Sequence, residues 1–142
     1  MTETYEGSCL CGAVKLEVSG APLMQGFCHC GTCRGWSATP VTAYALWPTA
    51  AVRIVAGEEK LKAYDRPGRL SRHHCADCGG AVATGLGGSP LTDVYPPILA
   101  GFAFAPAAHV NYAERMIDMK DGLPKFRDMP KEAGGSGEMI GE

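Results

Sequence analysis

The stretch CHCGTCR, residues 28–34, places three cysteines and a histidine within six positions. Cys28, Cys30 and Cys33 can supply three thiolates from one tight turn, and the surrounding sequence offers no obvious fourth ligand. A zinc ion with three protein ligands and one exchangeable position is typical of catalytic sites. The stretch therefore predicts a reactive metal site with these three cysteines as ligands.

His29 lies between the first two cysteines of this turn. Residues two apart in an extended segment face the same side, so His29 faces away from an ion that Cys28 and Cys30 share. Three roles stay open for His29: a packed or hydrogen-bonded side chain, a contact to substrate, or a direct metal ligand.

Four further cysteines form two pairs, CLC at residues 9–11 and CADC at residues 75–78. Cys9 and Cys11 can point to one side of an extended segment, and a C-x-x-C turn brings Cys75 and Cys78 to one ion. Two such pairs make a closed four-thiolate zinc site, which acts as a structural staple. Spacing alone leaves open which pair joins which, although four plus three is the natural partition.

A zinc ion bound by three thiolates carries a formal charge of −1, which weakens it as a Lewis acid. Such an ion is better suited to holding a substrate thiol as a thiolate, because metal coordination deprotonates a thiol at neutral pH. A fourth thiolate makes the site more negative, so a nearby cation matters. Arg34, which follows Cys33 directly, is the local candidate.

The composition indicates a folded domain of ordinary type. The chain has 142 residues, of which 46% are hydrophobic and 20% charged, close to the globular average. A net charge of −2 argues against a nucleic-acid partner, and no apolar run is long enough to cross a membrane. The N-terminus does not resemble a secretory signal, so we expect a cytoplasmic protein. Seven cysteines, an odd number, then favour metal ligands over disulfides.

Glycines and prolines spread along the chain favour short strands joined by turns. We therefore expect a mostly β fold, in which residues 13–18 alternate apolar and polar side chains as a half-buried strand does. Further strands are expected at 41–48, 52–59, 80–86 and 97–104. Gly57 is expected to end the strand at 52–59. Residues 109–119 alone have possible helical spacing. Residues 131–142 are polar and glycine-rich, which predicts a flexible C-terminal tail after a single domain at 1–130.

Three motifs, GSCLCGAV at 7–14, CHCGTCR at 28–34 and HCADCGG at 74–80, occur in the order and spacing of a known family. The chain resembles the glutathione-dependent formaldehyde-activating enzymes, a family that includes the centromere protein V type. The resemblance extends to residues 109–126 and implies a β-tent-like zinc-binding domain.

The resemblance also implies ligand sets and an activity. It assigns a structural zinc to Cys9, Cys11, Cys75 and Cys78, and a catalytic, labile zinc to Cys28, Cys30 and Cys33. The implied activity is that of a carbon–sulfur lyase, joining formaldehyde and glutathione into S-(hydroxymethyl)glutathione. Attack of a thiolate on a small aldehyde fits the chemistry expected from the residues.

Glutathione carries two carboxylates and needs cationic anchors, for which Arg34, Arg66, Arg69 and Arg72 are the candidates. The sequence leaves two other functions open. One is a non-enzymatic zinc module that binds a protein or nucleic acid, with both metals structural. The other is a redox protein that uses Cys30 and Cys33 as a dithiol.

Overall fold

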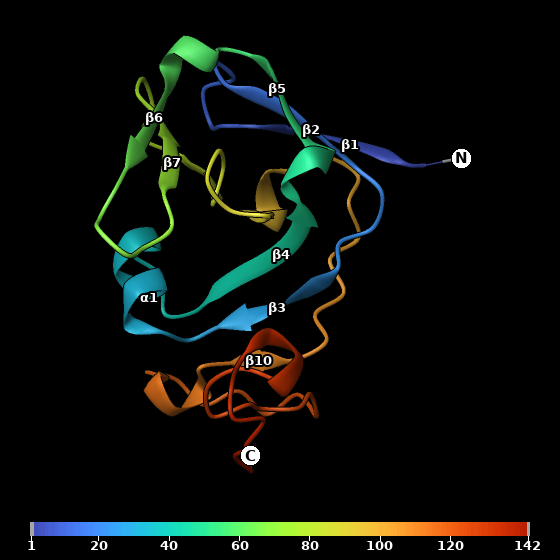
Figure 1. Ribbon diagram of the computed structural model, residues 1–142, viewed down its shortest axis with the longest axis vertical. Coiled ribbons are helices and arrows are strands. Elements are labelled where there is room, and N and C mark those ends of the chain that lie inside the picture. The colour runs from blue at the N-terminus through green and yellow to red at the C-terminus, as the bar shows by residue number, and fades with distance from the viewer. Residues whose placement is uncertain (1, 142) are drawn as a thin grey trace. The chain divides into compact units, whose positions relative to one another are not determined.

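The structure is a computed structural model that describes residues 2–141, and it is mostly β with short strands, as predicted (Figure 1). The strands are β1 (Thr4–Ser8), β2 (Lys15–Ser19), β3 (Met24–Cys28), β4 (Thr42–Pro48), β5 (Val52–Ala56), β6 (Leu61–Tyr64), β7 (Arg72–Cys75), β8 (Ala81–Thr84), β9 (Leu91–Val94) and β10 (His109–Val110). The helical elements are α1 (Gly31–Ser37) and the 3-10 turns η1 (Thr49–Ala51), η2 (Glu58–Lys60), η3 (Pro96–Ile98), η4 (Tyr112–Glu114) and η5 (Lys131–Ala133).

The chain forms two compact units, each built from two stretches of sequence. The first unit contains the residues up to Met24 together with Ala45–Phe104. The second contains Gln25–Tyr44 and the residues from Ala105 onward. The single domain at 1–130 stays a prediction.

The first unit contains an antiparallel sheet in the order β1-β2-β5, seen at the N-terminal end of the chain in Figure 1. Val14, Leu16 and Val18 are buried at alternate positions, which confirms the predicted strand. The strand β5 ends before Gly57, as predicted. Gly57 has φ +74°, and a Cβ there would lie 1.8 Å from the Ala13 carbonyl oxygen, so only glycine fits.

The first unit also pairs the end of β4 with β9, and continues through β8 and β7 to β6, with antiparallel neighbours throughout. Its core surrounds the completely buried Trp47, whose indole N–H donates to the Gly20 carbonyl over 2.9 Å. Phe102 packs against the Trp47 ring with 5.5 Å between ring centroids. Cys9 and Cys75 lie in the same core, so the first unit buries part of a cysteine cluster.

The second unit places β3 parallel to β10, with Phe27 opposite His109 and Cys28 opposite Val110. The two backbones approach closely at Gly26, where a Cβ would lie 2.3 Å from the Ala108 carbonyl oxygen. The helix α1 begins three residues after the end of β3, with Cys30 as its N-cap. This unit therefore carries the complete middle cysteine motif.

Two predicted elements differ in the structure. Residues 97–104 do not form a strand: η3 occupies their start, and Gly101 at φ +71° turns the backbone away from an extended course. Residues 109–119 do not form an α-helix, because β10 is followed by Asn111 in the left-handed region at φ 53° and then by the single turn η4. Hydrophobic spacing alone did not reveal either interruption.

The C-terminal residues form hydrogen bonds within the second unit. Ile140 N–H donates to the Lys125 carbonyl and Arg127 N–H to the Glu138 carbonyl, each over 2.8 Å. The Ser136 hydroxyl donates to Asp128 Oδ1, also over 2.8 Å. Flexibility of this tail in solution stays a prediction.

Candidate metal centres

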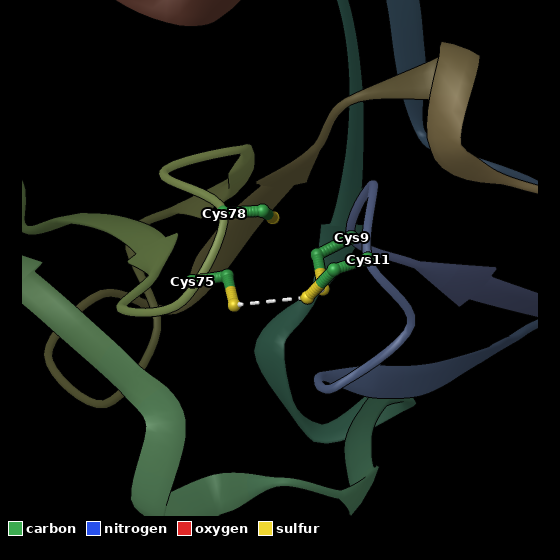
Figure 2. Close-up of side chains that lie close together, drawn as sticks. All are labelled: Cys9, Cys11, Cys75 and Cys78. Carbon is green, nitrogen blue, oxygen red and sulfur yellow. Dashed lines mark hydrogen bonds between the residues drawn. The ribbon is translucent and has the colours of Figure 1, made fainter.

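The first centre brings Cys9 and Cys11 from the loop after β1 together with Cys75 at the end of β7 and Cys78 in the turn that follows. Figure 2 shows the four side chains converging, with the sulfur of Cys75 facing that of Cys11. Their sulfur atoms all lie within 4.8 Å of one another. The structure thus joins the two pairs that the sequence left unassigned.

The spacing of these sulfurs fits a tetrahedral zinc ion. Thiolates at about 2.3 Å from zinc lie roughly 3.8 Å apart in a tetrahedron. The Cys9 and Cys11 sulfurs are 3.7 Å apart, and those of Cys11 and Cys75 are 3.8 Å apart. The four thiols are free, without a disulfide among them. The donor set is therefore compatible with zinc.

Backbone N–H groups point at the sulfurs of this first centre. Val14 N–H donates to Cys9 Sγ over 3.2 Å, and Gly80 N–H donates to Cys78 Sγ over 3.4 Å. A donor aimed at sulfur stabilises the thiolate, which is the form that binds metal. Both turns are thus shaped for ionised cysteines.

The thiol pKa values within this cluster move in opposite directions at Cys78 and Cys11. Hydrogen bonds from the backbone of Cys11 and Gly80 lower the pKa of Cys78 to about 6. At Cys11 the hydrogen bond from Ala13 N–H lowers the pKa. Desolvation and the neighbouring thiols outweigh it, and the pKa of Cys11 rises to about 11. Thiolates this close repel one another, so a cation is needed for all four to ionise together.

The second centre consists of Cys28 at the end of β3, Cys30 at the N-cap of α1 and Cys33 inside that helix. The Cys28 and Cys30 sulfurs are 3.4 Å apart, and all three sulfurs lie within 4.8 Å of one another. Cys33 N–H donates to Cys30 Sγ over 3.3 Å. Asn111 Nδ2 donates to Cys28 Sγ over 3.5 Å. The three predicted ligands therefore converge, again with donors aimed at sulfur.

Within residues 2–141 the second centre gathers these three cysteines and no fourth side chain of a metal-binding type. His29 is completely buried and its Nε2 lies 2.8 Å from Nδ1 of His109. Burial is the main reason that the pKa of His29 falls to about 4. Of its three open roles, this position favours the packed and hydrogen-bonded one.

Arg34 lies beside the second centre and is held by two carbonyl groups. Its Nε donates to the His29 carbonyl and one Nη to the Glu114 carbonyl, each over 3.0 Å. Arg34 also lines an open cavity of about 450 Å³. The remaining lining residues are Gly31, Gly35, Ala38, Thr39, Pro40 and Met116. A fixed guanidinium thus borders a space adjoining the cysteine-bearing helix.

The other predicted anchors and histidines belong to the first unit. Arg66 and Arg69 are exposed, and Arg72 is half-buried at the start of β7. His73 and His74 also lie on β7 and are not part of either cysteine cluster.

The chain is similar to known proteins in sequence and in fold. The model of the family described as glutathione-dependent formaldehyde-activating enzyme matches residues 4–112. The chain belongs to this family. The match includes all seven cysteines of the two centres.

Two relatives illustrate the similarity. An uncharacterized lyase of Schizosaccharomyces pombe (strain 972 / ATCC 24843) is 32% identical over 75 residues, which are 53% of this chain and 53% of that protein. The matched segment thus spans about half the length of this curated relative. A crystal structure of a Rhodobacter sphaeroides protein, a structural genomics target, aligns with a TM-score of 0.57 and 28% identity, covering 69% of this chain and 90% of that one.

Sequence reasoning gave no role to His109, which the structure places against His29. Asp121 forms hydrogen bonds with both His109 and Lys125. A single histidine distant from every cysteine motif gives no local signal of such a partnership. Among the described residues no helix is long and apolar enough to cross a membrane, and the cytoplasmic location stays a prediction.

Proposed function

We propose that this protein is a zinc-dependent lyase-type enzyme that joins a thiol, such as glutathione, with formaldehyde or another small electrophile. The observation that carries the proposal is the second centre. It offers three converging cysteines without a fourth side-chain ligand in the described chain, and the helix α1 that carries Cys33 also lines a cavity through Arg34. Membership of the formaldehyde-activating family and the lyase name of the Schizosaccharomyces pombe relative support this reading.

Cys28, Cys30 and Cys33 would hold the catalytic zinc. A zinc ion with an exchangeable position supplies a positive charge that favours the thiolate form of an incoming thiol at neutral pH. The N–H of Cys33 and the amide of Asn111 each donate a hydrogen bond to a cysteine sulfur. Such donors favour the thiolate form, which is the form that binds metal.

The proposed reaction is a simple addition. The substrate sulfur attacks the carbonyl carbon of formaldehyde and forms a carbon–sulfur bond, while the carbonyl π bond breaks toward oxygen. The proton lost by the thiol is balanced by the proton that the new alkoxide gains, so the product is a hydroxymethyl thioether. No oxidant or reductant is required.

Arg34 would bind a carboxylate of the thiol substrate. Its guanidinium is already oriented by two backbone carbonyls, so little side-chain entropy remains to be lost when an anion binds. Arg34 belongs to α1, the helix that contains Cys33, and it places a fixed positive charge on the cavity wall. A substrate with an acidic group on the same molecule as its thiol fits this arrangement.

Cys9, Cys11, Cys75 and Cys78 would hold a structural zinc. A four-thiolate site has no open position, and its ligands come from two loops that the metal would tie together. The proposed protein therefore carries two zinc ions with different tasks.

The test measures zinc per chain on protein purified without chelator, and then formation of S-(hydroxymethyl)glutathione by NMR with formaldehyde and glutathione present. Two zinc ions and a rate above the spontaneous reaction are expected. Cys30→Ser should lower zinc content to one per chain and abolish the catalysed rate. Two zinc ions with no response to any thiol would favour the non-enzymatic zinc module instead.

A further inference from the structure

A chain of hydrogen bonds leads from Lys125 through Asp121 and His109 to His29, the histidine of the second centre. Lys125 Nζ lies 2.6 Å from Asp121 Oδ1, and Asp121 Oδ2 lies 2.7 Å from His109 Nε2. His109 Nδ1 then lies 2.8 Å from His29 Nε2. His29 and His109 have no exposed surface, whereas the Asp121 side chain is 31% exposed. The proposed reaction assigns no role to this chain of contacts.

The carboxylate of Asp121, which lies between Lys125 and His109, determines which atoms donate in these hydrogen bonds. Partial burial opposes ionisation of Asp121, but hydrogen bonds from Lys125 and His109 hold its pKa well below the usual range. An ionised carboxylate only accepts, so His109 Nε2 carries the proton that it donates to Asp121. In the neutral form of His109 the other ring nitrogen, Nδ1, is the acceptor, which makes His29 Nε2 the donor and leaves a lone pair on His29 Nδ1.

The two histidines also connect the cysteine-bearing segment to the C-terminal segment. His29 N–H donates to the Val110 carbonyl over 3.1 Å, directly after the parallel pairing of β3 with β10. The His29 and His109 rings lie 5.0 Å apart between centroids and are tilted by 36°, and Tyr112 packs edge-on against His29 at 4.8 Å. Rotation of His29 would break this packing.

We propose that Asp121 and His109 are positioning residues for the second centre. They fix the tautomer and ring orientation of His29, and so hold the backbone between Cys28 and Cys30 in the conformation that turns both sulfurs toward one ion. The inference rests on the proposed function only in that the three cysteines bind a metal. Asp121 lies beyond the residues that the family model matches, so the motifs themselves do not indicate it.

The consequence is a metal affinity that depends on a carboxylate distant from the sulfurs. Replacing an outer residue that orients a metal site lowers the affinity by about 10- to 100-fold. We expect a loss of this size at the second centre for Asp121→Asn, and an unchanged affinity at the four-cysteine centre of the same molecule.

The experiment loads the full-length protein with cadmium-113, records one NMR resonance for each centre, and titrates with a chelator. In Asp121→Asn the three-cysteine resonance should disappear at 10- to 100-fold lower chelator, while the four-cysteine resonance keeps its midpoint. Nitrogen-15 imidazole spectra should show the tautomers inferred above for wild type, and a changed pattern at His29 and His109 in the variant.

Asp128→Asn is the matched control. Asp128 also lies in the second unit, where its carboxylate accepts hydrogen bonds from Met129 N–H and Ser136 N–H and not from either histidine. It should leave both cadmium midpoints unchanged. Because Asp121→Asn leaves the ammonium of Lys125 buried, the double variant Asp121→Asn with Lys125→Met is measured as well, and should show the same selective loss.

Three results would overturn the inference: unchanged midpoints in both Asp121 variants, an equal loss at the two centres, or the same loss in Asp128→Asn. If the wild-type three-cysteine cluster binds no cadmium, the proposed function fails together with the inference. Binding by wild type with unchanged variants would refute the positioning role alone.

Discussion

The sulfur of Cys11 lies 3.8 Å from the sulfur of Cys75, although 64 residues separate the two along the chain. The contact joins the loop after β1 to the end of β7, and Cys75 is completely buried in the core of the first unit. A metal at this point would hold together segments that are distant in sequence. The two centres should therefore differ in their effect on stability.

Replacing a ligand of the first centre should unfold the protein or lower its Tm by more than about 10 °C, because the binding energy of a structural zinc is part of the folding free energy. Cys75→Ser tests this by thermal unfolding followed with circular dichroism. Cys30→Ser is the control from the other centre, and should lose zinc with a change in Tm of only a few degrees. Equal destabilisation by the two variants would refute the division into structural and catalytic sites.

Metal removal should proceed in two separate steps. The three-cysteine centre leaves a coordination position exchangeable, so a chelator should extract its zinc first, with the far-ultraviolet circular dichroism retained. The second equivalent should leave only as the fold is lost. Zinc release measured with a colorimetric chelator, in parallel with circular dichroism, checks the order. Release of both equivalents in one phase would contradict it.

Arg34 should affect binding of an acidic thiol more than binding of a neutral one. Loss of a hydrogen bond to a charged group costs about 1.5–3 kcal/mol, or roughly 10- to 100-fold. Arg34→Gln should therefore raise the KM for glutathione about 10-fold or more and leave the KM for 2-mercaptoethanol nearly unchanged. Met116→Ala alters the same cavity without removing a charge. An equal rise for both thiols in Arg34→Gln would mean that Arg34 only maintains the local fold.

The cysteine clusters could be predicted because their geometry is encoded locally. A C-x-C or C-x-x-C spacing brings two sulfurs together whatever the rest of the fold does. The sequence therefore showed both cysteine pairs of the first centre and all three cysteines of the second. The alternating burial of Val14, Leu16 and Val18 is local in the same sense. What spacing left open was which pairs combine, since Cys11 and Cys75 meet only through the tertiary fold.

The contact between His29 and His109 could not be predicted, because 80 residues separate them and neither lies in a recognisable motif with Asp121. The helix α1 was missed for a different reason. It contains Gly31 and Gly35, which disfavour helix, and it is stabilised by the Cys30 cap and by a 2.7 Å bond from the Ser37 hydroxyl to the Cys33 carbonyl. Propensity gave no indication of these particular contacts.

The carboxyl group of the half-buried Asp93 should make stability depend on pH. It accepts a 3.1 Å hydrogen bond from Ala45 N–H, and burial raises its pKa to about 7 despite that bond and the charge of Arg72. An unfolded aspartate titrates near ~3.9. The native state therefore keeps a proton that the unfolded state has lost, and stability falls as pH rises toward and through 7.

Asp93→Asn keeps an oxygen that can accept from Ala45 N–H but removes the titration. The free energy of unfolding of the variant, relative to wild type, should increase from pH 6 to pH 8 and then level off, because above the folded pKa both states of the wild type are ionised. Urea unfolding at half-unit pH steps measures the difference. Glu17→Gln, on β2 of the same unit, removes a half-buried carboxylate that pairs with Arg53, and should not reproduce this rise. Parallel pH curves for wild type and Asp93→Asn would show that the carboxyl is ionised in the folded protein throughout this range.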